Sequence, residues 1–220
     1  MNKKENILVA GANGTTGKII IDLLKESSLY PPIAMVRKEE QKEHFEEQGV
    51  TPILADLEED VNHAFKDVDK VIFAAGSKGK KLVEVDQEGA KRLADAAKRA
   101  EARKFVMLSS ISADEPSASD DLKDYLKAKQ NADNHLRDSG LSYSIVRPGR
   151  LTNESSTGKI KVQKKLEKAG KITRADVAKV LVGVLDQEIM LNETFELING
   201  DTPIENALNW DKEESGMGYD

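Results

Sequence analysis

The sequence predicts an α/β fold: a doubly wound parallel sheet with helices on both faces. Two observations support this prediction. Short apolar runs alternate with amphipathic helical patterns over most of the 220 residues, and the first apolar run leads directly into a glycine-rich turn and a helical pattern. Strands that alternate with helices form right-handed βαβ units, so the strands run parallel. Because their carboxyl ends then meet at one edge of the sheet, we expect a functional site there.

The first predicted strand is the apolar run Ile7–Ala10, and apolar residues recur at helical spacing directly after the turn that follows it. In that turn, Gly11 permits a tight bend, Gly14 lets a pyrophosphate approach the backbone, and Gly17 lets the helix pack closely on the strand. Free N–H groups at the start of the helix attract an anion. The pattern predicts a cradle for the phosphates of a nucleotide, although a glycine-rich turn without a ligand would have the same spacing.

Further apolar runs predict strands at 33–36, 51–54, 70–74, 105–108 and 143–146, with helices near 39–48, 59–65, 82–100 and 120–139 between them. A last helix at about 175–185 and a last strand at about 194–198 follow. We therefore predict a single domain over residues 1–204. Within this domain, residues 150–172 form a small insertion on the substrate side. After the domain, residues 205–220 form a polar, acidic tail that we expect to be flexible.

Composition excludes several classes of function. The net charge is −6, from 39 acidic and 33 basic residues, and the basic residues are scattered, so we expect no nucleic-acid or membrane partner. We expect a cytoplasmic protein, because no apolar run approaches the roughly 20 residues of a membrane span and no signal-peptide core precedes the first strand. The absence of cysteine excludes disulfides, thiolate metal sites and a cysteine nucleophile. The three histidines are far apart in sequence, so no metal site is expected.

The second predicted strand ends at Arg37, followed by Lys38. A site that prefers NAD usually carries Asp or Glu here, about 20 residues after the glycine turn, to bind the ribose hydroxyls. A guanidinium instead binds a 2′-phosphate through a forked pair of hydrogen bonds, which favours NADP over NAD. The alternative is a solvated basic pair that opens the acidic helix after it.

Small and acidic residues follow the third and fourth predicted strands. Asp56, which precedes Leu57, can accept a hydrogen bond from an adenine amino group, but it is equally typical of a helix cap. Ala74, Ala75 and Gly76 leave room for the backbone of a cofactor, although ordinary packing at a strand end needs the same small residues.

The fifth predicted strand ends in Ser109-Ser110, and Tyr125 and Lys129 follow about 15 residues later on a predicted helix. Residues four apart share a helix face, so the Tyr125 hydroxyl and the Lys129 ammonium can converge on one point. A nearby ammonium favours the phenolate form, which suits Tyr125 to transfer the proton that accompanies hydride transfer. Ser110 can hydrogen-bond the substrate oxygen. The alternative is a surface tyrosine on a lysine-rich helix.

The combination of the glycine turn, Arg37, the Ser-Ser strand end, Tyr125-x-x-x-Lys129 and Arg147-Pro148-Gly149 resembles the short-chain dehydrogenase/reductase superfamily. More narrowly, it resembles the atypical NAD(P)H-binding group that is called NAD-dependent epimerase/dehydratase-like. The segments 143–149 and 172–178 are similar to late-chain signatures of that group, and the resemblance covers roughly residues 6–204.

The resemblance implies a Rossmann-type sheet of about seven strands, bound NADP, and a loop at Pro148, Gly149 and Leu151 beside the nicotinamide. It places Ser110, Tyr125 and Lys129 at the catalytic positions, with Ser109 and Ser112 as alternatives to Ser110. The full expected set of cofactor-binding residues is Gly11, Asn13, Gly14, Thr15, Thr16, Gly17, Arg37, Asp56, Leu57, Ala74, Ala75, Gly76, Lys129, Pro148, Gly149 and Leu151.

The function predicted from these residues is an NADP-dependent oxidoreductase or epimerase-like enzyme that acts on a small carbonyl or alcohol substrate. Only 73 residues follow Arg147, which argues against a large nucleotide-sugar substrate. Two alternatives remain, since a retained fold does not prove turnover: a redox-sensing NADP(H)-binding module, and a flavin or quinone reductase that needs no Tyr-Lys pair. The long helices predicted at 82–100 and 120–139, which follow the fourth and fifth strands, are candidates for a homodimer interface.

Overall fold

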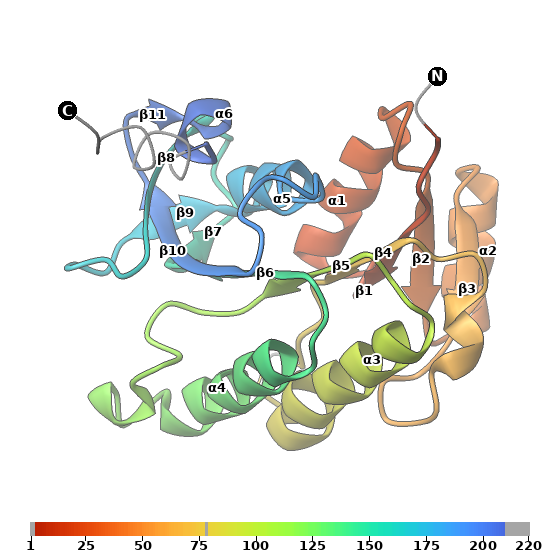
Figure 1. Ribbon diagram of the computed structural model, residues 1–220, viewed down its shortest axis with the longest axis horizontal. Helices are drawn as coiled ribbons and strands as arrows, with labels where there is room; N and C mark the ends of the chain where they lie inside the picture. The colour runs from red at the N-terminus through yellow and green to blue at the C-terminus, as the bar shows by residue number, and fades with distance from the viewer. Residues whose placement is uncertain (1–2, 78, 210–220) are drawn as a thin grey trace.

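The computed structural model describes residues 3–77 and 79–209. Its centre is a nine-stranded sheet in the order β11-β8-β10-β6-β5-β4-β1-β2-β3 (Figure 1). The seven strands from β3 to β10 in this order are parallel, as predicted. They are β1 (Ile7–Ala10), β2 (Pro32–Val36), β3 (Thr51–Leu54), β4 (Lys70–Phe73), β5 (Lys104–Leu108), β6 (Tyr143–Pro148) and β10 (Glu193–Asn199).

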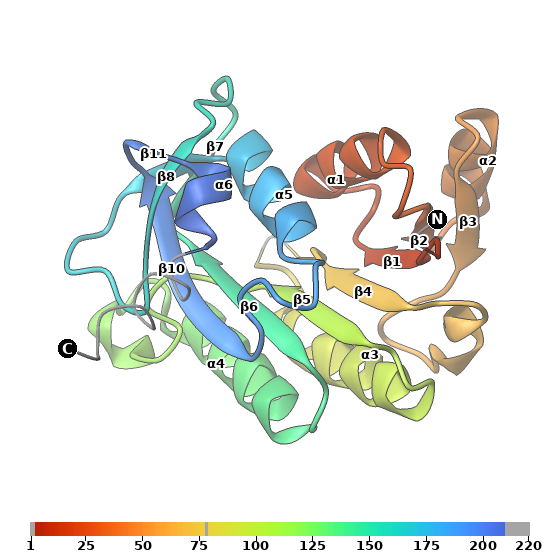
Figure 2. The ribbon, with the colours of Figure 1, turned by 45° about the horizontal axis from the view of Figure 1, so that its top comes forward.

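Helices cover both faces of this sheet. Helices α1 (Thr15–Lys25), α2 (Glu39–Glu47) and α5 (Arg174–Gly183) lie on one face, and α3 (Glu88–Arg99) and α4 (Lys123–Asp138) lie on the other (Figures 1 and 2). Successive residues of a strand point to opposite faces, so Ile7 and Val9 pack in the core under α1, whereas Leu8 and Ala10 pack in the core over α3. Burial on both faces explains why the strands are continuous apolar runs.

The region after β6 adds more strands than the seven we predicted. Strands β8 (Lys159–Gln163) and β11 (Thr202–Pro203) extend the sheet with antiparallel pairing. Strands β7 (Arg150–Thr152) and β9 (Lys171–Thr173) form a separate parallel pair. Residues 150–172 are therefore partly an extension of the main sheet, because β8 pairs with β10.

The predicted flexible tail, 205–220, is wrong at its start. Residues Ile204–Ala207 form the short helix α6, and Ile204, Ala207 and Leu208 are buried against the core. Ala207 and Leu208 follow Ile204 by three and four residues, so the three apolar side chains share one face and dock this turn on the sheet extension. The charged residues around them in the sequence obscured this pattern. Residues 210–220 lie outside the described part of the chain.

Three predicted helices differ from the structure. In place of a helix over 59–65 there is only the 3₁₀ turn η1 (Asn62–Phe65), because the carboxylates of Asp56 and Asp60 accept hydrogen bonds from N–H groups two residues on and hold the chain in turns. The helix predicted over 82–100 begins as the π-helical segment η2 (Leu82–Gln87) and continues as α3. The helix predicted from residue 120 begins at Lys123, after the 3₁₀ turn η3 (Pro116–Ala118).

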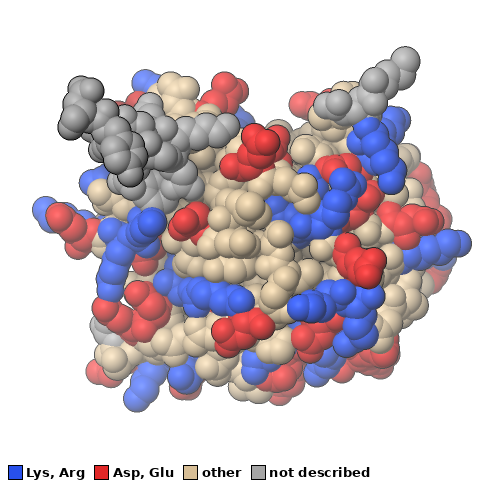
Figure 3. All heavy atoms as spheres, in the orientation of Figure 1, with Lys and Arg blue, Asp and Glu red and all other residues tan. Residues whose placement is uncertain are grey.

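The surface carries charges of both signs. On the face drawn in Figure 3, acidic and basic side chains are interspersed around an uncharged centre. Within the described residues, no helix combines the length and the apolar character that a membrane crossing requires.

Candidate active site

The glycine turn after β1 has the geometry of an anion cradle. Gly11 has a φ of +86°, which residues other than glycine rarely adopt. A Cβ atom on Gly17 would lie 2.0 Å from the carbonyl oxygen of Gly11, so only glycine lets α1 approach the turn this closely. Gly14 caps α1 without any side-chain hydrogen bond, which leaves the first N–H groups of the helix available to a ligand.

The cradle lies where the strand order of the sheet reverses. Strand β1 pairs with β2 on one side and with β4 on the other, so the carboxyl ends of all three meet at this point. A Cβ atom on Gly11 would lie 2.6 Å from the backbone nitrogen of Ala75, which shows how closely the segment after β4 follows the glycine turn. Open α/β sheets bind their ligands at such a switch point.

The two charged candidates at the ends of β2 and β3 differ in whether their side chains are hydrogen-bonded. The Arg37 side chain is exposed, and within the described residues its guanidinium makes no hydrogen bond or ion pair; only its backbone N–H is bonded, to Gln41 Oε1 at 3.3 Å. Asp56 Oδ1 accepts the N–H of Glu58 at 3.0 Å, so the carboxylate caps a turn, one of the two roles weighed above. Leu57 is buried beneath α3, where a Cβ on Gly89 would contact it at 2.9 Å.

Tyr125 and Lys129 lie one turn apart on α4, as the spacing predicted. The Lys129 side chain is buried, and its Nζ lies 5.7 Å from the centroid of the Tyr125 ring. The ammonium donates to the carbonyl oxygen of Leu108, the last residue of β5, at 3.3 Å. The ammonium therefore lies over the Tyr125 ring, near the carboxyl end of β5.

The structure distinguishes the three candidate serines. Ser109 is buried, and its hydroxyl donates to Asp133 at 2.9 Å, so it is committed to an internal contact. Ser110 is half-buried, and its hydroxyl makes only a long contact, 3.3 Å, with the carbonyl of Ile111. Ser112 has a φ of +64° and contributes its backbone N–H to Glu196 at 3.3 Å. Ser109 is therefore the least available of the three, and the hydroxyls of Ser110 and Ser112 both stay candidates for contact with a substrate.

The candidates after β6 are packed tightly within the protein. Pro148 and Gly149 are buried, and a Cβ on Gly149 would lie 2.4 Å from the carbonyl oxygen of Gly170. Leu151 is half-buried in β7 and pairs with Ile172 of β9. Glycine is required at position 149 because two backbone segments approach each other there.

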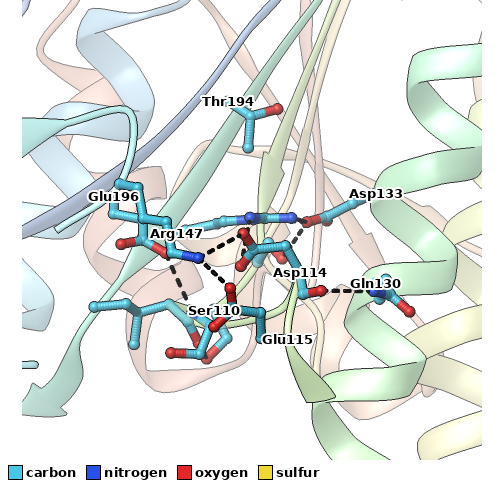
Figure 4. Close-up of polar contacts among 12 residues, drawn as sticks. Ser110, Asp114, Glu115, Gln130, Asp133, Arg147, Thr194 and Glu196 are labelled. Carbon is cyan, nitrogen blue, oxygen red and sulfur yellow. Dashed lines mark hydrogen bonds and ion pairs between the residues drawn. The ribbon is translucent and has the colours of Figure 1, made fainter. Parts of the chain in front are cut away.

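A buried ion pair behind Ser110 escaped the sequence analysis. Figure 4 shows Asp133 of α4 facing the guanidinium of Arg147, which reaches it from β6. Arg147 Nε and Nη2 contact Asp133 Oδ2 at 3.0 and 2.9 Å, and Arg147 Nη1 lies 3.4 Å from Asp114. Burial raises the pKa of Asp133, and Arg147 opposes that rise. Because Asp133 follows Lys129 by four residues, its helix face was predictable, but its partner was not.

Two more buried carboxylates hold segments around the site. Asp86, in η2, lies 3.7 Å from Lys129 Nζ. Glu196, in β10, accepts the N–H groups of Ser112 and Leu166, which lie in the loops after β5 and β8 (Figure 4). The sequence did offer one signal for Glu196, because it is a charged residue inside an apolar strand pattern. Its role could not be predicted, since its partners lie in loops that periodicity cannot place.

Together, the cradle, the switch point and the parallel sheet define a dinucleotide-binding domain of the Rossmann type. The chain belongs to the NAD(P)H-binding family, whose model matches residues 11–188. Its fold is that of the NAD-dependent epimerase/dehydratase-like oxidoreductases. The predicted resemblance is confirmed at this level.

Individual relatives match nearly the whole chain. The uncharacterized sugar epimerase YhfK of Bacillus subtilis (strain 168) is 41% identical, over 92% of this chain and 98% of its own length. A solved structure from Bacillus halodurans, provisionally assigned as an NAD-dependent epimerase/dehydratase, is 40% identical with a TM-score of 0.89, covering 94% of this chain and 99% of that one. The oxidoreductase ylbE of Lactococcus lactis is 31% identical with a TM-score of 0.85, covering 94% and 97%.

Proposed function

We propose that the protein is an NADP-dependent oxidoreductase that acts on a small carbonyl or alcohol substrate. One observation carries the proposal: a buried ammonium, Lys129, lies beside the Tyr125 phenol at the same sheet edge as the glycine cradle. A buried charge is costly, so an ammonium in this position is best explained by a need for positive charge next to the phenol.

The residues at this edge suit the parts of NADP. The N–H groups of the glycine turn would hold the diphosphate, and the exposed, unpaired Arg37 guanidinium would hold the 2′-phosphate. Lys129 would bind the nicotinamide ribose. The hydroxyl of Ser77, which follows Gly76, supports a ligand here, because it is buried and has no hydrogen-bond partner within the described residues.

Three side chains are assigned to the chemistry. A bound nicotinamide supplies a hydride donor or acceptor. The Tyr125 hydroxyl gives or takes the accompanying proton, and the Lys129 ammonium lies over the ring of Tyr125. The Ser110 hydroxyl donates a hydrogen bond to the substrate oxygen and stabilises the charge that develops on it.

The test measures NADPH oxidation against panels of carbonyls, flavins and quinones for the wild type, Tyr125→Phe and the matched control Tyr143→Phe. Tyr143 begins β6 at the opposite edge of the sheet. We expect Tyr125→Phe to lower carbonyl reduction by about 100-fold or more without weakening NADPH binding, and Tyr143→Phe to change neither. Flavin or quinone reduction at an unchanged rate in Tyr125→Phe would favour the flavin or quinone reductase alternative. Tight NADPH binding with no acceptor reduced would favour the sensor.

A further inference from the structure

Asp86 connects the candidate catalytic lysine to the segment that borders the cofactor cradle. It is 2% exposed, and its Oδ1 lies 3.7 Å from Lys129 Nζ. Its Oδ2 accepts the backbone N–H of Ser77 at 3.0 Å. A Cβ atom on Gly76 would lie 3.4 Å from the same Oδ1, so the carboxylate lies directly against the segment after β4. One buried side chain thus contacts two parts of the site.

The position of the Lys129 ammonium depends on few contacts. Within the described residues it has one hydrogen bond, to the carbonyl of Leu108 at 3.3 Å, and one ion pair, with Asp86. Both contacts are long, which leaves the ammonium with donor capacity for a ligand. Asp86 supplies the negative charge that makes burial of Lys129 tolerable, because an isolated buried ammonium would lose its hydration without compensation.

The π-helical segment η2 explains how Asp86 reaches this place. The segment runs from Leu82 to Gln87 directly before α3, and it packs against α4, which carries Lys129. π-Helical turns are rare and are found frequently at functional sites. The wider turn here ends one residue after Asp86, where the regular α-helix begins.

We propose that Asp86 is a positioning residue that holds the Lys129 ammonium beside Tyr125 and fixes the segment after β4 to the same point. This inference rests on the proposed function, since it assigns Asp86 a role toward the proposed Tyr-Lys pair. The carboxylate therefore affects the affinity for the cofactor through the position of the Lys129 ammonium, which the proposed function assigns to the nicotinamide ribose.

The test uses Asp86→Asn, because an asparagine oxygen can still accept the Ser77 N–H while the charge is lost. We expect NADPH, titrated by its own fluorescence, to bind 5- to 10-fold more weakly. We also expect the KM for NADPH to rise by a similar factor, while kcat falls less than it does in Tyr125→Phe, because the proton donor itself is retained. The matched control is Asp95→Asn, an exposed carboxylate of α3 that contacts His135. It should change neither measurement.

A double variant separates positioning from stability. Asp86→Asn alone leaves Lys129 buried without a counterion and should lower the urea midpoint of unfolding, whereas Asp86→Asn with Lys129→Met removes both charges and should restore it. Because Lys129 is itself assigned to the nicotinamide ribose, NADPH affinity is compared between the wild type and Asp86→Asn alone, both folded in the absence of urea. Wild-type affinity in the folded but destabilised Asp86→Asn variant would show that Asp86 serves only the fold and would overturn the proposal.

The outcomes also separate this inference from the proposed function. If Asp86→Asn weakens NADPH binding but no acceptor is ever reduced, the enzyme assignment fails and the positioning of Lys129 stands. If Tyr125→Phe abolishes turnover while Asp86→Asn changes neither the affinity nor the KM for NADPH, the function stands and the role of Asp86 is refuted.

Discussion

The buried lysines at the amino and carboxyl edges of the sheet, where the parallel strands begin and end, differ in how well their ammonium groups are hydrogen-bonded. At the amino edge, Lys104 begins β5 and donates to the carbonyls of Asp186 and Ile189, both at 2.7 Å. Lys70 begins β4 there, donates to the carbonyl of Leu185 at 2.8 Å, and pairs with Glu5 at 2.5 Å. The short segment between α5 and β10 thus supplies these ammonium groups with close, well-matched acceptors.

At the carboxyl edge, Arg147 is paired with Asp133 and Asp114, but two other cations keep spare donors. Lys129 has one hydrogen bond at 3.3 Å and an ion pair at 3.7 Å, and the Arg37 side chain has no partner within the described residues. A cation whose donors are all satisfied contributes to the fold, whereas one with free donors can bind a ligand. The difference agrees with the proposed cofactor site at the carboxyl edge.

The largest expected effect tests the structural edge. Lys104→Met should lower the free energy of unfolding by about 3 kcal/mol, because the carbonyls of Asp186 and Ile189 lose their hydrogen bonds to a charged donor. Urea denaturation measures this loss, and NADPH titration of the folded variant should give the wild-type affinity. Weakened NADPH binding in the folded variant would contradict the division between the two edges.

The pH dependence of the free energy of unfolding gives a second test of the buried Lys104. Burial, and next the nearby charge of Lys70, lower the pKa of Lys104 to about 8, while Asp186 opposes the shift. Between pH 8 and 10 the unfolded chain then binds more protons than the folded protein, so the free energy of unfolding should rise with pH.

We expect that rise to be about 2 kcal/mol in the wild type, as urea denaturation from pH 7.5 to 9.5 would measure, and to be absent in Lys104→Met. The series stays below pH 10 because burial raises the pKa of Tyr30, which packs over Lys70. Equal slopes in both proteins would show that Lys104 is not the group responsible.

The smallest effect concerns the exposed cation at the functional edge. Arg37→Ala should weaken NADP binding by about 1 to 2 kcal/mol and leave NAD binding nearly unchanged, because only the 2′-phosphate loses a charged partner and solvent screens the contact. Calorimetric titration with both nucleotides measures the difference, and Lys38→Ala is the neighbouring control. Equal losses for NADP and NAD would remove the assignment of Arg37.

The fold was largely predictable because the strands are buried on both faces. Runs such as Ile7–Ala10 and residues 105–108 are apolar throughout, and their alternation with helices leaves few topologies open. Strand β8 was not predicted, since its alternation of exposed lysines with Ile160 and Val162 resembles a lysine-rich loop. Its pairing with β10 depends on a contact between distant segments.

In the candidate site, sequence spacing predicted the groups of residues that lie together on a single turn or helix. The glycine turn and the Tyr125–Lys129 pair are each set within a single turn or helix. Asp86 and Glu196 were missed because their partners belong to other elements, and each carboxylate reads as an ordinary charged residue in the sequence. Arg147 was noted only as part of a motif, and its buried partner Asp133 was visible only in three dimensions.

The packing of α5 on α1 has a consequence for how the chain is made. The apolar side of α1, with Ile20, Ile21 and Leu24, is covered by α5, which ends at residue 183 (Figure 1). During synthesis from the amino terminus, the ribosome has to deliver most of the polypeptide before that side of α1 is covered. The first helix to emerge is therefore among the last to be enclosed, and a nascent chain halted near β6 presents an uncovered apolar strip to chaperones.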